Sequence, residues 1–248
     1  MDPIAKGQRA RSLFSYGAFH FIDDGFADSI YLLLPFIAAE LHLSFSEVGI
    51  LKGVFSGAMG LFQLPLSLLG ERVGELTVVA SGTLGLAGGF LLLSMATTFP
   101  AFFIALILAK GTAAGQHGLS SSVLSRVFEG SGRRAAMGTF NFSGDVGKVC
   151  VPFLLALLIN FVGWRPAVFS LSIGGIIIGV ILWVLARKSQ ASPLSLPAKQ
   201  GQAVEGNRWG ISDPKGFSAL LTIGIIDIST RTALLTFLPF LLLKTEIP

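Results

Sequence analysis

Three aspartates and a histidine stand in a segment that is otherwise apolar, HFIDDGFADSIYLLLPF over residues 20–36. His20, Asp24 and Asp28 are four residues apart and share one face of a helix, whereas Asp23 points to the side. A carboxyl group in apolar surroundings, or beside a second acid, holds a proton more readily, and a nearby Lys or Arg opposes this. The pattern predicts groups that take up and release a proton as their partners move.

Charged residues also interrupt other apolar segments. Eight of them fall near the middle of a predicted membrane segment, namely Asp23, Asp24, Asp28, Lys110, Asp145, Lys148, Asp227 and Arg231. Insertion of one such residue costs about 2.5 to 3.5 kcal/mol, so eight facing lipid would cost on the order of 20 kcal/mol. We therefore expect these side chains to face one another or a hydrated cavity.

Their spacing suggests partners. Lys110 and His117 are seven residues apart and are predicted to lie on one helix face. The pairs Asp145 with Lys148, and Asp227 with Arg231, are three and four residues apart and can pair along their own helices. Structural salt bridges, and histidines that are simply satisfied in the interior, are the alternative interpretation of these residues.

The composition identifies the environment of these charges. Of 248 residues, 52% are hydrophobic and 13% charged, and the mean hydropathy is +0.74, which indicates an integral membrane protein. The single cysteine, Cys150, excludes an intrachain disulfide and is interpreted as a packing residue. No HExxH-type metal motif or nucleophile elbow is present. We expect no enzyme activity, cofactor, metal or nucleic-acid partner.

Seven apolar stretches are long enough to cross a bilayer as helices. They are residues 13–38, 46–69, 76–96, 99–122, 136–161, 166–186 and 217–243. The third and sixth stretches carry no charge and are predicted to be lipid-facing supports. Small residues four apart, such as Gly85 and Gly89 or Gly175 and Gly179, are typical of close helix contacts.

The orientation follows from the basic residues in the connections. Of the 18 Lys and Arg residues, twelve lie in connections on the N-terminal side, two (Arg165 and Lys244) lie on the other side, and four lie within the predicted spans. This asymmetry places the N-terminus in the cytoplasm. We expect a multi-pass membrane protein in this orientation.

A long polar connection and a short repeat divide the chain. Residues 188–216 are rich in Pro, Gly, Ser and Gln and are predicted to be a cytoplasmic linker. Ile22-Asp23 precedes Leu34-Pro35-Phe36 just as Ile226-Asp227 precedes Leu238-Pro239-Phe240, at an offset of 204 residues. We therefore predict a six-helix bundle over 1–187, the linker, and the first helix of a second parallel-repeat bundle over 217–248. The rest of that second half is expected beyond the residues given.

Three stretches carry a resemblance to a known family. They are LPFIAAELHLSFSEVGIL over 34–51, GLFQLPLSLLGERVGE over 60–75, and GQHGLSSSVLSRVFEGSGRRAAMGTFNFSGDVGKVCVPF over 115–153. Together they resemble the fosmidomycin-resistance-like group within the major facilitator superfamily. Glu71, Arg72 and Gly74 occupy the places of the acid, base and glycine of the family's conformational-signature loop.

Other positions match the family less closely. Gly144, Gly147 and Pro152 form a looser version of the segment that recurs in antiporters, and plain helix packing is the alternative for these glycines. Ser67 stands where the signature loop usually opens with glycine, and Glu75 follows Gly74 where basic residues are usual.

The resemblance implies an all-α polytopic carrier of the bacterial inner membrane. Such a carrier works by alternating access and exports a small organic or drug-like molecule, driven by protons. The interpretation assigns proton coupling or cation contact to the aspartates and His20, and contact with an anionic substrate, or control of the acids, to Lys110, Lys148 and Arg231. An importer or uniporter of a small anionic metabolite is the alternative on the same fold. A seven-helix sensor is disfavoured by the predicted orientation, and a membrane-embedded enzyme by the missing motifs.

Overall fold

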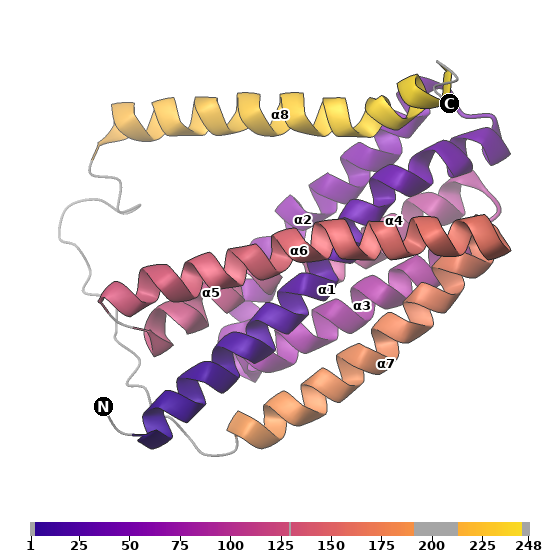
Figure 1. Ribbon diagram of the computed structural model, residues 1–248. Coiled ribbons are helices and arrows are strands. Elements are labelled where there is room, and N and C mark those ends of the chain that lie inside the picture. Colours follow the sequence, from indigo (N-terminus) through magenta and orange to yellow (C-terminus); the bar gives the residue numbers. More distant parts are fainter. Residues whose placement is uncertain (1–2, 129, 191–212, 245–248) are drawn as a thin grey trace. The chain divides into compact units, whose positions relative to one another are not determined.

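The computed structural model describes residues 3–128, 130–190 and 213–244, which form α helices and contain no strand (Figure 1). The helices are α1 (Pro3–Leu41), α2 (Phe45–Val73), α3 (Glu75–Met95), α4 (Phe99–Ala113), α5 (Gln116–Val127), α6 (Ser131–Val162), α7 (Trp164–Gln190) and α8 (Pro214–Lys244). The prediction of an all-α polytopic fold is confirmed.

Six segments of the described chain are long and apolar enough to cross a membrane: α2, α3, α4 with α5, α6, α7 and α8. Helix α1 is longer than any of these, at 39 residues, but carries the three aspartates. Large apolar side chains such as Leu61, Phe153 and Ile177 lie exposed on the outside of these helices. Water would disfavour such a surface, and the acyl chains of a bilayer would solvate it.

The described helices belong to two compact units, one containing α1 to α7 and one containing α8. Most of the predicted linker, residues 191–212, lies outside the described residues. The predicted boundaries at 187 and 217 therefore stay a prediction.

The fourth predicted span is present but broken. Helix α4 ends at Ala113 and α5 begins at Gln116. Glycines flank the break, and a Cβ atom at Gly111 or Gly115 would lie 3.1 Å from Phe62 or Leu66 of α2. Lys110 and His117 are consequently on two helices, and both side chains nevertheless contact α1, at Asp23 and Asp24.

Helices α1 and α6 approach each other backbone to backbone. A Cβ atom at Gly147 would lie 2.1 Å from the carbonyl oxygen of Phe21, and one at Gly25 would lie 2.9 Å from the carbonyl oxygen of Gly147. Only glycine fits such a crossing. Figure 1 shows the two helices crossing near their middles.

The spaced glycines differ in their surroundings. Gly85 and Gly89 lie against Thr112 and Ala109 of α4, as the spacing predicts. The glycines of α2 at 49, 53 and 57 would each place a Cβ atom in open space. Their role is therefore not packing within the described unit.

Helix α3 is largely buried and packs against α2, α4 and α7. The prediction that it is a lipid-facing support is wrong, because an uncharged apolar helix suits a protein core as well as lipid. Helix α7, the sixth predicted span, has an exposed apolar face, as expected of a lipid-facing helix. Ile177, Ile178 and Ile181 lie on its surface.

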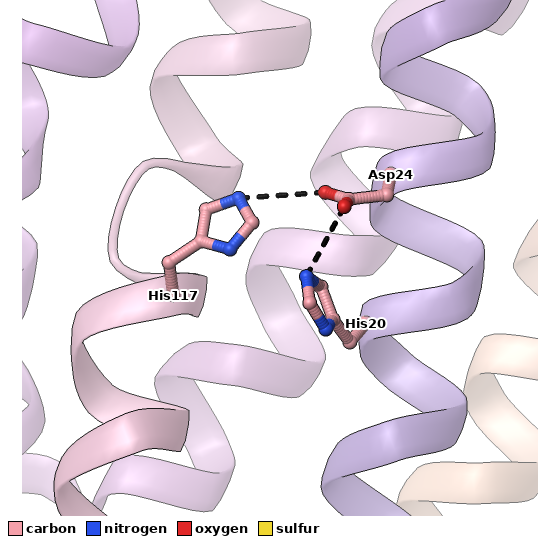
Figure 2. A group of neighbouring side chains, drawn as sticks. All are labelled: His20, Asp24 and His117. Atoms are coloured by element: carbon pink, nitrogen blue, oxygen red, sulfur yellow. Dashed lines mark ion pairs between the residues drawn. The ribbon is translucent and has the colours of Figure 1, made fainter. Parts of the chain in front are cut away.

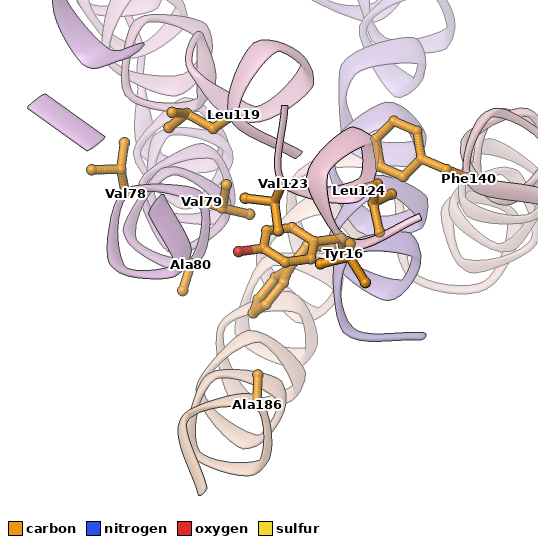
Figure 3. Packing of buried hydrophobic residues seen from close by; sticks show 11 residues of the cluster. Tyr16, Val78, Val79, Ala80, Leu119, Val123, Leu124, Phe140 and Ala186 are labelled. Carbon is orange, nitrogen blue, oxygen red and sulfur yellow. The ribbon is translucent and has the colours of Figure 1, made fainter. Parts of the chain in front are cut away.

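An apolar cluster closes one end of this unit, where α1 begins and α7 ends. It joins Tyr16 and Phe19 of α1 to side chains of four other helices, and Figure 3 shows the packing. The other members are Val78, Val79, Ala80, Leu119, Val123, Leu124, Val127, Phe140 and Ala186. His20 lies directly beside this cluster, since its ring stacks on Phe140 at 4.1 Å between centroids.

Candidate functional site

Asp24 is the centre of a charged cluster inside the bundle. Its Oδ2 atom lies 3.1 Å from His20 Nε2 and 3.1 Å from Lys148 Nζ, and its Oδ1 atom lies 3.4 Å from His117 Nε2. Figure 2 shows the two imidazole rings converging on this carboxylate from α1 and α5. Asp24 is 5% exposed, so these contacts take the place of hydration. One acid thus connects three helices.

Asp23 forms a separate pair with α4. Its Oδ2 atom accepts a hydrogen bond from Lys110 Nζ at 3.2 Å, and both side chains are buried. Its Oδ1 atom is buried without a hydrogen-bond partner among the described residues. Adjacent residues of a helix project about 100° apart. This divergence lets Asp23 face α4 while Asp24 faces α5 and α6.

His20 is fixed by the backbone of α6. Its Nδ1 atom lies 2.9 Å from the carbonyl oxygen of Phe140. A carbonyl oxygen only accepts hydrogen bonds, so Nδ1 must carry a proton and donate it. The remaining nitrogen, Nε2, is the atom that faces Asp24.

Gly144 makes room for this arrangement. A Cβ atom at this position would lie 2.6 Å from His20 Cε1 and 2.7 Å from Asp24 Oδ2. Pro152 lies inside α6 and has no N–H group, which leaves the carbonyl of Lys148 without its usual helical partner. Two of the three predicted antiporter-segment residues, Gly144 and Gly147, are therefore in contact with the α1 segment that holds the site.

Other predicted residues lie outside the cluster. Asp145 is exposed and accepts a hydrogen bond from Lys148 at 2.9 Å. Asp28 is partly buried and forms no ion pair within the described residues. Asp227 and Arg231 lie 3.8 Å apart on α8, both exposed, and belong to the other unit.

The sequence analysis missed two polar side chains of the interior. Lys52 is one of the four cations within the predicted spans and is not among the predicted site residues, although it is only 8% exposed. Gln116 is 1% exposed, and neither atom of its amide group has a partner among the described residues. A polar residue in the middle of an apolar segment is the signal that could have found both.

His20, Asp24 and His117 also offer donor atoms within 4.8 Å of one another, close enough to approach one metal ion. The ammonium group of Lys148 already lies 3.1 Å from Asp24. A divalent cation at the same carboxylate would meet this positive charge at short range. A metal ion at this donor set would therefore compete with Lys148 for the carboxylate.

The predicted signature loop joins α2 to α3. Gly74 has a φ of 99°, a value that side chains strongly disfavour, so glycine is needed there. Glu71 and Arg72 are exposed. Glu75, the departure from the family pattern, binds Arg126 at the end of α5 through both carboxylate oxygens. The carboxylate of Glu75 is thus paired with a cation of the same unit.

An arginine connects three helices at the end of the bundle opposite the apolar cluster. Arg165, at the start of α7, pairs with Glu40 of α1 at 2.5 Å and donates to the carbonyl oxygens of Ser94 and Ala96. These hydrogen bonds to the carboxylate lower the pKa of Glu40, which lies beyond the predicted span 13–38. The contact joins the ends of α1 and α3 to α7.

A groove of about 600 Å³ lies between α1, α6 and α7 and is lined by residues such as Leu13, Phe21, Ser143 and Leu182. It has no charged lining residue. A charged ligand would lose its hydration there without a partner. The groove therefore suits an apolar ligand better than a charged one.

An all-helical membrane bundle with buried ion pairs on facing helices defines the class, a polytopic membrane protein. The chain belongs to the Major Facilitator Superfamily, whose sequence pattern matches residues 13–246.

Two similar proteins illustrate the relationship. A probable L-galactonate transporter of Escherichia coli (strain K12) is 27% identical over 182 residues, covering 73% of this chain and 40% of that protein. The crystal structure of a bacterial homolog of the human lysosomal transporter Spinster, in an inward-facing and unoccupied conformation, matches with a TM-score of 0.63 and 17% identity, covering 74% of this chain and 43% of that chain. The chain thus spans less than half of either protein.

Proposed function

We propose that this protein is a proton-coupled secondary transporter that exports a small organic or drug-like molecule by alternating access across the bacterial inner membrane. In this proposal the six spans from α1 to α7 form one half of the pathway, and α8 belongs to the second half. The N-terminus lies in the cytoplasm, as the twelve-to-two distribution of basic residues indicates.

The observation that supports proton coupling is the double contact of His20. Nδ1 donates its proton to the Phe140 carbonyl oxygen, so Nε2 has no proton of its own in the neutral ring. This Nε2 atom lies 3.1 Å from a carboxylate oxygen of Asp24. Both Nε2 and the carboxylate have lone pairs, so a stable contact needs a proton between them. The His20–Asp24 pair is therefore the proposed proton-binding site.

Loss of this proton changes the site. The Nε2 lone pair would then face the Asp24 carboxylate, and the two groups would repel each other. Asp24 keeps its contacts with Lys148 and His117, whereas His20 stays on the α6 carbonyl. Proton release thereby alters how α1 is held against α5 and α6, which is the link to the conformational change that alternating access requires.

The remaining charges complete the proposed mechanism. The buried Asp23–Lys110 pair holds α1 to α4, and Asp28 provides a further acid facing the interior. We propose that Asp227 and Arg231 on α8 serve the second half in the same way that the α1 acids serve the first. Glu71, Arg72 and Gly74 are proposed to act at the loop that changes with the transport state.

Reconstituted full-length protein tests this proposal. Proteoliposomes with a pH dye inside should show proton movement when a substrate gradient is imposed, and Asp24→Asn should abolish it. Asp213→Asn removes an exposed carboxylate that lies outside the Asp24 cluster and is the control. Substrate flux without any proton movement in the unmodified protein would refute the coupling.

The orientation has its own test. A reporter enzyme that is active only in the cytoplasm, fused after residue 205, should be active. Activity of a periplasmic reporter at the same position would contradict the proposed topology.

A second candidate, import or uniport of a small anionic metabolite, is favoured by one observation. The similar Escherichia coli protein is named a probable L-galactonate transporter, and galactonate is a small organic anion. Uptake of labelled L-galactonate into cells that make the full-length protein separates this candidate from export. Proton-dependent accumulation inside the cells would replace the export proposal.

A further inference from the structure

Lys52 is a buried cation without a carboxylate partner in the described part of the chain. Its Nζ atom donates to Ser56 Oγ at 3.2 Å and lies over the rings of Tyr31 and Phe55, at 4.5 and 5.2 Å from their centroids. An ammonium group has three N–H donors, and the ring faces satisfy it only in part. A buried charge of this kind is costly unless a counter-charge approaches it.

The other two interior lysines of the bundle are already paired. Lys110 binds Asp23, and Lys148 binds Asp24 and Asp145. Asp28 of α1 interacts electrostatically with Lys52, but the two form no ion pair. Within the described residues, Lys52 is therefore the interior lysine whose charge is available to a ligand.

The chain around Lys52 leaves space for such a ligand. Ser56 is exposed on α2. Gly53 and Gly57 flank it, and a Cβ atom at either position would meet no atom within 4 Å. The ammonium and the hydroxyl thus lie beside an open, side-chain-free strip of α2.

We propose that Lys52 and Ser56 bind the carboxylate of a monoanionic substrate, whose body lies along the glycine strip of α2. One ammonium and one hydroxyl offer two donors, which match the two oxygens of a carboxylate. The nearby negative charge of Asp28 disfavours a dianion at the same place. This inference rests on the proposed transport function and names the substrate class.

Ligand-induced thermal stabilisation of the purified full-length protein tests the inference. The probes are L-galactonate, gluconate, benzoate and hexanoate, each compared with its uncharged amide. At least one carboxylate should raise the melting temperature more than its amide. Lys52→Met should weaken its apparent affinity by about tenfold or more, the usual scale for a hydrogen bond to a charged group.

The variants keep the outcome interpretable. Lys52→Arg retains the charge and should keep part of the affinity, and Ser56→Ala should show a smaller loss than Lys52→Met. Lys188→Met removes an exposed lysine near the end of α7 and should bind like the unmodified protein. If Lys52→Met does not fold, Lys52→Arg and Ser56→Ala carry the test.

The results separate this inference from the proposed function. Unchanged carboxylate binding in Lys52→Met, or no preference for any carboxylate over its amide in the unmodified protein, overturns the inference. Lys52-dependent binding together with transport that moves no protons upholds it and refutes only the proton coupling. Proton-coupled transport of an uncharged probe that Lys52→Met leaves intact refutes the inference and upholds the coupling.

Discussion

Gly144 of α6 lies directly against His20 of α1, so that a single added carbon at Gly144 would stand 2.6 Å from the imidazole ring. The same carbon would meet Asp24, since the two side chains share this space. The proposed proton site therefore depends on a residue that carries no charge and makes no hydrogen bond through a side chain.

Gly144→Ala should disturb the His20–Asp24 contact. We expect a loss of stability of about 1 to 3 kcal/mol, as for an overpacked interior, and a loss of proton movement. Thermal unfolding in detergent and the proteoliposome pH assay measure the two effects. Gly138→Ala on the same helix has open space around it and should be neutral or slightly stabilising. Proton movement at the unmodified rate in Gly144→Ala would contradict the assignment.

The Asp23–Lys110 pair should behave as a buried ion pair. Lys110→Met leaves the Asp23 carboxylate buried and unpaired and should cost about 3 to 5 kcal/mol of stability. Adding Asp23→Leu to Lys110→Met should recover much of this loss, because no lone charge then remains. The four proteins of this double-mutant cycle are compared by denaturant unfolding. Additive losses would mean that the two side chains do not act as a pair.

The Arg165–Glu40 contact predicts a pH dependence. Arg165 lowers the pKa of Glu40 from its ordinary value of 4.5. The contact should stabilise the fold fully above that ordinary value and lose its effect as the pH falls through the lowered pKa. Glu40→Gln should therefore lower the melting temperature at pH 7 and make less difference near pH 3. A difference of equal size at both pH values would show that charge is not the cause.

The turn between α2 and α3 should require glycine. At the φ of 99° observed for Gly74, an alanine side chain meets its own backbone, and we expect Gly74→Ala to cost about 1 to 2 kcal/mol. Gly132→Ala, in the first turn of α6 with open space around it, is the control. Thermal unfolding gives the comparison. Equal stability of the two variants would mean that the turn relaxes to another conformation.

Several features of the molecule could be predicted from residue type and spacing. An all-helical membrane fold follows from long apolar runs, because backbone groups in lipid must be satisfied within each segment. The buried acids and bases were also predictable, since charges in such runs are too costly to face lipid. The i,i+3 pair of Asp145 and Lys148 needs only helical geometry, and the structure shows it.

Contacts between helices could not be derived in this way. Pattern and hydropathy leave the rotation of each helix open, so they could not assign Asp23 to Lys110 or Asp24 to His117 and Lys148. They also missed the break between α4 and α5, which brings His117 to α1 on a separate helix from Lys110.

The chain by itself determined which residues must avoid lipid, because that cost depends on the side chain and its apolar neighbours along the helix. The tertiary structure alone decided their partners. Close crossings such as that of α1 and α6 at Gly25 and Gly147 set the rotation of each helix. The rotation gives Asp24 three positively charged or titratable neighbours. It also leaves Lys52 with no acid within ion-pair distance among the described residues.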